Sequence, residues 1–462
     1  MLSKVFDIGR RSLSAYQYAM NVTSHNLANV NTEGFTRQRV VFQSETPEYH
    51  GSLEWGSGVK IQDIARIKNQ LVDSQLVIYN STYADANKKS ELLSEMESLL
   101  SEPSEVGISK LMNTFFNSWA DVAANPSLSA YRQNLIQAAD KLSNKFKLIN
   151  TGYAQLKQDM KFELQEKVND LNAKLAQIKI LNQKIFEAKL QNVVANDLQD
   201  QRDKLVQDIS KYVNTKVSIN DKGHLSLNLG GAFGVDEGNS AEFKVNETTD
   251  GKLTISMKDD ENATITLKSG EFAAIVDVYN NTIPKFKSTI DNMAQTIVDK
   301  VNELHVQGFT FHQPPLGGKN SVNDPGAIKF FDGYINGELK INDLILQDDK
   351  YIAASLTSAP DNGENALRIA NIAQNNVISG TTLNDFYSKF LVEVGNEATT
   401  NQQKVDSNKA ILDQLQLQRD SYAGVSIDEE MTNMITYQRS YQASARVIKA
   451  ADELLQSLLS MV

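Results

Sequence analysis

The residue types that carry out catalysis are present in this chain, but not in catalytic spacings. The five histidines are scattered, and none belongs to an H-E-x-x-H motif or another paired metal-ligand pattern. They are His25, His50, His224, His305 and His312. The chain has no cysteine either, so a zinc site is not expected. We therefore expect no metal ligands and no cofactor.

One glycine-rich segment faintly resembles a phosphate-binding loop. It reads Gly317-Gly318-Lys319-Asn320, but position 313 is Gln rather than Gly and position 320 is neither Ser nor Thr. The chain has no G-x-S-x-G elbow and no G-x-G-x-x-G after a predicted strand. Carboxylates are so plentiful that nominating two of them as an acid/base pair would mean little. The sequence therefore predicts no catalytic residues and a protein that is not an enzyme.

Spacing is regular at the two ends of the chain, where apolar residues recur in alternating steps of four and three. Such steps place a narrow stripe on one side of a helix, which is typical of a coiled-coil seam. The predicted assembly seam consists of Leu2, Phe6, Leu13, Tyr16, Met20 and Leu27 near the N-terminus, and of Ile427, Met431, Met434, Tyr441, Ala445, Ile448, Leu455 and Leu459 near the C-terminus. A lone helix of this length is marginal in water. We therefore expect both ends to be poorly ordered until they pack on each other or on further copies.

Two polar residues interrupt the C-terminal stripe, and they have two interpretations. Gln438 and Asp452 could lie in the seam and fix its register or oligomeric state, because a buried polar group needs a specific partner. Alternatively, a slight rotation of the helix would leave both at the edge of the seam, next to Arg439 and Lys449.

Composition excludes two classes of protein. Of 462 residues, 41% are hydrophobic and 22% charged, which is typical of a globular protein. The net charge of −11 and the absence of a dense basic run argue against nucleic acid binding. No segment has the roughly 20 apolar residues that a membrane helix needs. Asp7, Arg10 and Arg11 interrupt any secretory signal, so the protein is expected to be cytosolic or exported by a route that does not read one.

The rest of the chain predicts long helices with β structure inserted among them. A helix over 1–28 is followed by short strands near 39–42 and 59–64 and a helix over 65–100. Heptad spacing with one stutter predicts long packed helices over 128–213, with a break near Gly152. The stripe consists of Leu135, Ala139, Leu142, Phe146, Ile149, Tyr153, Leu156, Met160, Leu164, Val168, Leu171, Leu175 and Ile178. Another long helix is predicted over 401–422.

Residues 215–267 alternate with period two and predict strands, and a helix over 283–306 separates them from further strands at 339–341 and 344–346. The expected fold is mainly α with a β-rich inserted domain, in an elongated multidomain protein whose terminal helices form a coiled-coil layer on a long helical-bundle stem. The expected domains are a terminal coiled coil (1–30 and 425–462), a helical stem with a short β-hairpin region (31–212, 276–310 and 359–424) and a β-rich outer domain (213–275 and 311–358).

A turn motif ends the first helix. It reads Ser24-His25-Asn26-Leu27-Ala28-Asn29-Val30-Asn31-Thr32-Glu33-Gly34-Phe35, in which the Asn residues and Gly34 tolerate left-handed backbone. This text resembles the N-terminal signature of bacterial flagellar axial proteins, the rod, hook and hook-associated group. The segments 424–431 and 437–448 resemble the C-terminal signature of that family. We take Asn26, Ala28, Asn29, Asn31, Thr32, Gly34 and Phe35 as the family turn motif.

Three features point to the hook-associated branch of this family. They are the continuation Thr36-Arg37-Gln38, the helical stem over 128–213, and the segments 270–274 and 301–309. Glu33 stands where Pro is frequent in the family and Phe35 where Tyr is frequent. The resemblance implies a structural component of the flagellum that joins hook to filament as a ring of identical subunits.

The resemblance also implies partners and a location. Family members are exported unfolded through the flagellar type III apparatus, and their terminal helices pack together as the innermost tube. The implied partners are further copies of the chain, the flagellar hook protein, a second hook-associated protein and an export chaperone on the C-terminal helix. The implied location is outside the cell, at the hook–filament junction, without insertion in a membrane.

Three alternatives remain open at this point. The chain could be another axial component, such as a distal rod or hook subunit. It could be a secreted helical adhesin or effector whose β insertion binds a host surface. A wall-degrading enzyme within the β insertion is the third.

Overall fold

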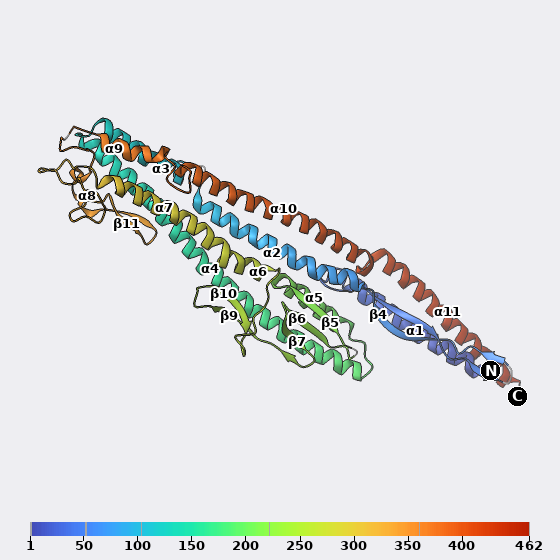
Figure 1. Cartoon of the computed structure of the whole chain (residues 1–462). Helices are drawn as coiled ribbons and strands as arrows, with labels where there is room; N and C mark the ends of the chain where they lie inside the picture. Colours follow the sequence, from blue (N-terminus) through green and yellow to red (C-terminus); the bar gives the residue numbers. More distant parts are fainter. Residues whose placement is uncertain (1, 51–52, 103, 221, 360, 462) are drawn as a thin grey trace.

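The computed structural model describes residues 2–50, 53–102, 104–220, 222–359 and 361–461 of an elongated, mainly helical molecule (Figure 1). Its two chain ends lie together at one extremity, where α1 (Leu2–Ala28) and α11 (Ile427–Ser460) run side by side. The expected class, an elongated helical protein with inserted β structure, is confirmed. Within the described residues no helix combines the length and apolar character that crossing a membrane requires.

The stem is built from four long helices. The stem helices are α2 (Gln70–Leu100), α4 (Ser129–Leu190), α7 (Ile283–His305) and α10 (Leu383–Ala423). Shorter helices complete it: α3 (Ile108–Ala124), α5 (Asn196–Tyr212), α6 (Glu271–Asp277), α8 (Asp343–Gln347) and α9 (Glu364–Ala370). Single turns of other helix types are η1 (Val278–Thr282), η2 (Asp349–Tyr351) and η3 (Asn371–Gln374).

The helix α4 has 62 residues and is therefore about 93 Å long. Every position of the heptad stripe predicted for it is buried, including the positions after the stutter. The expected break near Gly152 is wrong, because α4 continues through it. Gly152 instead permits close packing, since a Cβ there would lie 2.6 Å from Leu99 of α2.

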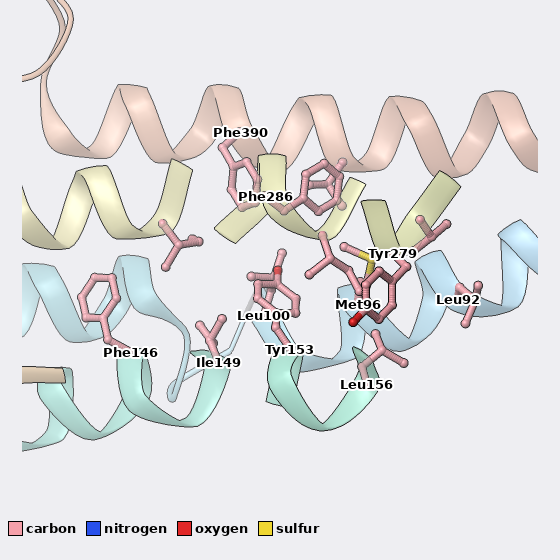
Figure 2. Close-up of a cluster of buried hydrophobic side chains, with 14 of the residues drawn as sticks. Leu92, Met96, Leu100, Phe146, Ile149, Tyr153, Leu156, Tyr279, Phe286 and Phe390 are labelled. Carbon is pink, nitrogen blue, oxygen red and sulfur yellow. The ribbon is translucent and has the colours of Figure 1, made fainter. Parts of the chain in front are cut away.

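Large side chains from five stem elements fill the core (Figure 2). They come from α2 (Leu92, Met96, Leu100), α4 (Phe146, Ile149, Tyr153, Leu156), η1 and α7 (Tyr279, Phe286) and α10 (Phe390). The rings of Phe286 and Phe390 meet edge to face with centroids 5.3 Å apart. Burial of this kind contributes roughly 1.5–3 kcal/mol per large apolar side chain, so the stem is stabilised within one chain.

A long hairpin and its tip extend from the base of the stem along α1. The strands β1 (Gln38–Ser44) and β4 (Val59–Arg66) are antiparallel, and the tip is a second pair, β2 (Glu48–His50) and β3 (Leu53–Trp55). Nothing is described of residues 51–52. The predicted strand near 59–64 is thus longer than expected, and the hairpin covers one side of α1.

The remaining strands form three sheets on the stem. One has the order β5-β6-β7-β8, and the others are the pairs β9–β10 and β11–β12. The bounds are β5 (Thr215–Ile219), β6 (Leu225–Leu229), β7 (Ala232–Asp236), β8 (Asn239–Ser240), β9 (Phe243–Glu247), β10 (Leu253–Met257), β11 (Phe331–Ile335) and β12 (Glu338–Ile341). The predicted strand at 344–346 is wrong, because the segment is helical (α8). Its N-cap is Asn342, whose side chain accepts a hydrogen bond from the backbone N–H of Leu344.

The two β-rich segments that the sequence analysis groups as one outer domain contact α4 at different heights. Asn182 of α4 bonds the backbone of Leu225 at 2.8 Å, whereas Ser143 donates to the carbonyl of Leu339 at 2.8 Å. These two α4 residues are separated by about 58 Å along the helix axis. The sheets therefore pack against the stem at two separate places.

Candidate assembly site

The terminal helices α1 and α11 form an antiparallel pair. Asn26 meets Glu430 at one end of the pair, and Gly9 meets Ile448 nearer the other. A Cβ on Gly9 would lie 2.4 Å from the Cγ1 of Ile448, so the absence of a side chain lets the two helices approach closely. The chain ends predicted to lie together do so within a single copy.

On α11, the side chains turned toward α1 and the hairpin follow a stripe in strict steps of four and three. The stripe consists of Glu430, Met434, Tyr437, Tyr441, Ser444, Ile448, Ala451 and Leu455, all buried or half-buried. Four members of the predicted seam belong to it: Met434, Tyr441, Ile448 and Leu455. At two of the predicted positions the structure uses the residue one place earlier, Glu430 instead of Met431 and Ser444 instead of Ala445. The predicted seam residues Ile427 and Leu459 lie beyond the ends of the stripe, and they are exposed like Met431 and Ala445.

The shift of the α11 stripe has a physical reason. Along the stripe the contact surface offers small or bonded residues, such as Ser444, Ala451 and the ion-paired Glu430, which fit a close helix pair. Apolar character alone could not predict this choice. Gln438 and Asp452 are both exposed, so the interpretation that places them outside the seam holds within one chain.

On α1 the residues with the least exposure are small or polar. They are Gly9, Ala15, Ala19, Thr23 and Asn26. The large residues of the predicted seam, namely Phe6, Leu13, Tyr16, Met20 and Leu27, are only half-buried, and the side chain of Leu2 lies outside the described part. Sequence reasoning missed Ala15 and Ala19, although their spacing of four residues with Thr23 was a usable signal.

An aromatic cluster joins the hairpin to both terminal helices. The ring of Phe42 in β1 lies 5.9 Å from Tyr16 of α1 and 6.1 Å from Tyr437 of α11, measured between centroids. The rings of Tyr16 and Tyr437 are stacked at 6.4 Å. Such pairs contribute about 0.5–1.5 kcal/mol beyond their buried area. The hairpin therefore fixes one side of the helix pair and leaves the other side open.

Asn26 of the turn motif holds three segments together. Its side chain accepts a hydrogen bond from the backbone N–H of Gln38 at 3.0 Å and donates to the carbonyl of Gln38 at 2.8 Å. The same amide nitrogen donates to the carboxylate of Glu430 at 3.1 Å. The side-chain amide of Asn26 is buried, and both its nitrogen donor and its oxygen acceptor are bonded. A side chain that lacked either the donor or the acceptor would therefore leave polar groups of Gln38 or Glu430 unpaired.

Arg37 completes the connection between the helix pair and the stem. Its guanidinium binds Glu430 at 2.7 Å and Glu429 at 2.6 Å, and its backbone N–H donates to the carbonyl of Ala423 at the end of α10. Burial by itself would lower the pKa of Arg37, but the two carboxylates outweigh it and the pKa is raised. Arg37 therefore remains charged and anchors the start of α11.

Other residues of the turn motif shape the loop itself. Asn29 donates to the carbonyl of His25 at 3.0 Å, and Thr32 donates to Asn29 at 3.0 Å. Gly34 has a φ of +84°, a conformation that favours glycine, and the ring of Phe35 meets that of His25 edge-on at 5.5 Å. Ala28 and Asn31, by contrast, are exposed and carry no side-chain bond of this kind.

A buried ion network anchors the hairpin to α5 of the stem. Arg66 binds Asp200 at 2.7 Å and Asp203 at 2.8 Å, and Asp200 also accepts the backbone N–H of Thr36 at 2.9 Å. Burial tends to raise the pKa of Asp203, but Lys68 and Arg66 outweigh it and hold that pKa below its usual range. The turn motif, the hairpin and the stem are thus joined at one place.

The helix α11 also presents large apolar side chains to solvent. They are Ile427, Met431, Ile435, Val447, Leu454, Leu458 and Leu459, and their exposed fractions range from 44% to 73%. By helical position, the first three lie to one side of the buried stripe, and Val447, Leu454 and Leu458 lie to the other. Exposed apolar groups in such numbers on one helix make α11 a candidate protein contact surface.

Metal-ligating side chains are dispersed over the described residues. Among them, no group of three or more His, Cys, Asp or Glu side chains gathers in a way that could hold a metal ion. The segment 317–320 is a loop in which both glycines have positive φ, and Gly318 lies against the ring of Phe309. The features with built geometry are therefore the terminal helix pair and its turn.

Three models of known protein families match parts of this chain. A family model described as the flagellar hook-associated protein FlgK helical domain matches residues 93–319. The model of the flagellar basal body rod FlgEFG protein C-terminal region matches 405–461, and that of the flagella basal body rod protein matches 6–36. All three models describe flagellar proteins, so the chain is similar to the bacterial flagellar axial proteins along its stem and at both ends.

Relatives that match over the whole chain narrow this similarity to one kind of flagellar protein. Flagellar hook-associated protein 1 of Bacillus subtilis is 28% identical, over 98% of this chain and 97% of the relative. The proteins of the same name from Salmonella typhimurium and Escherichia coli are 23% and 22% identical, with full coverage of both chains. The chain is thus most like the hook-associated protein FlgK, a component of the flagellum.

A solved structure shows the same fold. The flagellar hook junction protein FlgK from Burkholderia pseudomallei matches with a TM-score of 0.64 at 14% identity. The match covers 76% of this chain and all of that one.

Proposed function

We propose that this chain is a structural adapter, a ring of identical subunits that joins the flagellar hook to the filament. The observation that carries the proposal is the exposed apolar surface of α11, which one chain leaves without a partner. Because burying apolar surface drives association, further copies arranged around a common axis would cover it. The names of the relatives, hook-associated and hook junction proteins, support this position in the flagellum.

We further propose how the subunits reach and hold that position. The chain is exported unfolded through the flagellar type III apparatus, with an export chaperone holding the amphipathic C-terminal helix beforehand. The hook protein lies below the ring and a second hook-associated protein above it. Residues 1–30 and 425–462 form the inner layer, the stem the next layer, and the β-rich segments face solvent. The role is structural, without enzymatic turnover.

A truncation tests the proposed role directly. Deleting residues 432–462 removes most of α11 while leaving the stem core intact, so the variant should fold but fail to enter the flagellum. Cells should then make hooks and lose filament subunits to the medium, which immunoblotting of the medium measures. Normal swimming would overturn the proposal. Electron microscopy of the null mutant separates the alternatives, since bare hooks favour the junction and absent hooks favour a rod or hook subunit.

A point substitution separates folding from assembly. Met431 is 44% exposed, so Met431→Asp should leave the unfolding free energy of the isolated subunit nearly unchanged. In an assembled ring the same charge would be buried at a cost of several kcal/mol, and incorporation should fall strongly. The matched control is Leu148→Asp on α4, which is 60% exposed on the stem and should incorporate as wild type. Equal incorporation of both variants would contradict the proposed contact surface.

A further inference from the structure

A hollow of about 450 Å³ lies at the base of the stem, where α2, α5, α10 and β5 meet. All five residues of β5, Thr215–Ile219, line it. The strand β5 is the edge of the four-stranded sheet, and within the described residues its outer side pairs with no other strand. An open edge beside a hollow offers backbone N–H and C=O groups to an additional strand.

The walls of the hollow are apolar at the centre. Val77, Val206 and Leu225 are buried and form part of the wall. Ile78 and Ile219 also border the hollow, but their side chains are 57% and 49% exposed. An isolated subunit therefore leaves apolar surface uncovered next to a free strand edge. A large aromatic side chain would cover it.

The charges around the hollow favour an acidic occupant. Its lining includes three cations, Lys68, Lys216 and Arg419, but only two carboxylates, Asp73 and Asp203. Lys68 lies 3.1 Å from Asp203 and 3.7 Å from Asp73, so both carboxylates are already engaged. Lys216, the second residue of β5, is exposed. A carboxylate arriving along β5 would meet this lysine.

The tip of the hairpin has the complementary chemistry. Trp55 and Tyr49 are 36% and 74% exposed, whereas the other tryptophan, Trp119, is fully buried. Glu54 is exposed beside Trp55, and within the described residues the pair β2–β3 is bonded to no other strand. The tip thus combines an aromatic anchor, an acidic group and a free strand edge.

The tip of a given chain cannot reach its own hollow. Arg66 at the end of β4 is held by Asp200 and Asp203, and Asp203 lines the hollow. The eight residues of β4 extend about 26 Å away from that point, and Lys4 of α1 binds Glu48 of the tip at 2.6 Å. The tip therefore points along the helix pair, away from the stem.

We propose that β3 of one subunit adds to the β5 edge of a neighbouring copy, with Trp55 in the hollow and Glu54 near Lys216. This inference rests on the proposed function, because stacked copies bring the tip of one to the stem base of the next. The contact links the terminal layer of one subunit to the stem of another. It also explains why an exposed tryptophan lies at the end of a hairpin.

Cross-linking tests the contact in the full chain, which contains no native cysteine. Gly56 follows β3 and has no neighbouring atom within 4 Å of an added Cβ, so Gly56→Cys is tolerated. Combined with Ser218→Cys on β5 and a short thiol-reactive cross-linker, it should give a ladder of dimers and trimers in isolated flagella. The matched control replaces Ser218→Cys by Asn239→Cys, on the exposed opposite edge of the same sheet, and should give no ladder.

Each outcome decides between the hypotheses. A flagellum that contains the double variant without a ladder overturns the strand contact and leaves the proposed function standing. A ladder with Leu454→Cys of α11 in place of Ser218→Cys would show that the tip docks on a neighbouring helix, which also overturns it. Absence of the wild-type chain from isolated flagella would instead overturn the proposed function.

Removing the side chain of Trp55 provides an independent test of the proposed contact. Trp55→Ala in the Gly56→Cys, Ser218→Cys background should lower the yield of cross-linked dimer more than tenfold, as expected for a central aromatic contact. The control is Tyr18→Ala, which truncates an aromatic side chain of α1 that is 55% exposed and should leave the yield unchanged. Equal yields with and without Trp55→Ala in this double-cysteine background would overturn the assignment of Trp55 to the hollow.

Discussion

The stem and the terminal helix pair are both built from long helices with heptad spacing, but they bury different residues. The stem encloses large side chains such as Phe146, Tyr153 and Phe286. The terminal pair encloses mainly small ones such as Gly9 and Ala19, and its larger apolar residues stay half-buried or exposed. The stem core is therefore complete in one chain, whereas the terminal pair leaves large apolar side chains uncovered within one chain.

The largest expected effect probes the stem. Phe146→Ala removes a fully buried ring of α4 and should lower the free energy of unfolding by about 4 kcal/mol, through lost burial and the cavity left behind. The control Leu148→Ala, on the same helix but 60% exposed, should change it by less than about 0.5 kcal/mol. Urea unfolding measures both. Similar losses of unfolding free energy in Phe146→Ala and Leu148→Ala would show that the stem core does not dominate the stability of the protein.

The second effect also belongs to the stem and depends on pH. His305 is fully enclosed, its Nδ1 donates to the carbonyl of Ile328 at 2.8 Å, and its Nε2 accepts the backbone N–H of Ala353 at 3.0 Å. Burial lowers the pKa of His305 to about 4. The unfolded chain takes up this proton near pH 6.5 but the folded chain only near pH 4, so stability falls as pH falls through that window, by about 3 kcal/mol in total.

Urea unfolding of wild type and His305→Gln between pH 7 and pH 4 checks the expected pH dependence. The variant should be less stable at pH 7 and should lose less on acidification, because its side chain does not titrate. Hydrogen exchange should place the acid-induced opening near α7 and not in the terminal pair. Identical pH slopes for both proteins would contradict the assignment to His305.

The third effect concerns the connection between the two regions. Glu430→Ala leaves Arg37 and Asn26 without one partner each, and since Arg37 keeps Glu429, the expected local loss is about 2 kcal/mol. Hydrogen exchange should accelerate in α1 and α11 while the stem stays protected. Glu429→Ala removes the exposed partner of Arg37 and should have a much smaller effect. Faster exchange throughout the stem would mean that the two regions open together.

The smallest effect tests the close approach within the terminal pair. Gly9→Ala places a Cβ 2.4 Å from Ile448, and the overpacking, offset partly by better helix propensity, should destabilise the pair by about 1 kcal/mol. Adding Ile448→Ala should relieve the clash. Gly395→Ala in α10, where a Cβ meets nothing within 4 Å, should instead stabilise its helix. Hydrogen-exchange rates measure the effect of Gly9→Ala in α1 and that of Gly395→Ala in α10. If Gly9→Ala stabilised the helix pair, the close packing of Gly9 on Ile448 would be contradicted.

Patterns within short segments of the sequence were enough to predict part of the fold. The heptad stripe of α4 follows directly from residue spacing, because a long amphipathic helix must bury its apolar side. The turn after α1 was readable in part: Gly34 has the expected left-handed backbone, whereas Asn29 has a negative φ and contributes a side-chain bond to the carbonyl of His25. The sequence analysis missed the helix α8 because the three apolar residues Leu344–Leu346 suggested a strand. The signal for a helix was Asn342, which is the N-cap in the structure.

The sequence by itself determined the helix periods and the turn motif, because these depend on spacing within short segments, and the matching apolar stripes at the two ends predicted that these ends meet. Only the tertiary structure decided which face of α11 is buried, since the close approach at Gly9 and the bonds of Glu430 shift the seam by one residue at two of the predicted positions. It also decided that the β-rich segments contact α4 at separate heights. Both depend on contacts between segments far apart along the chain, which local pattern does not encode.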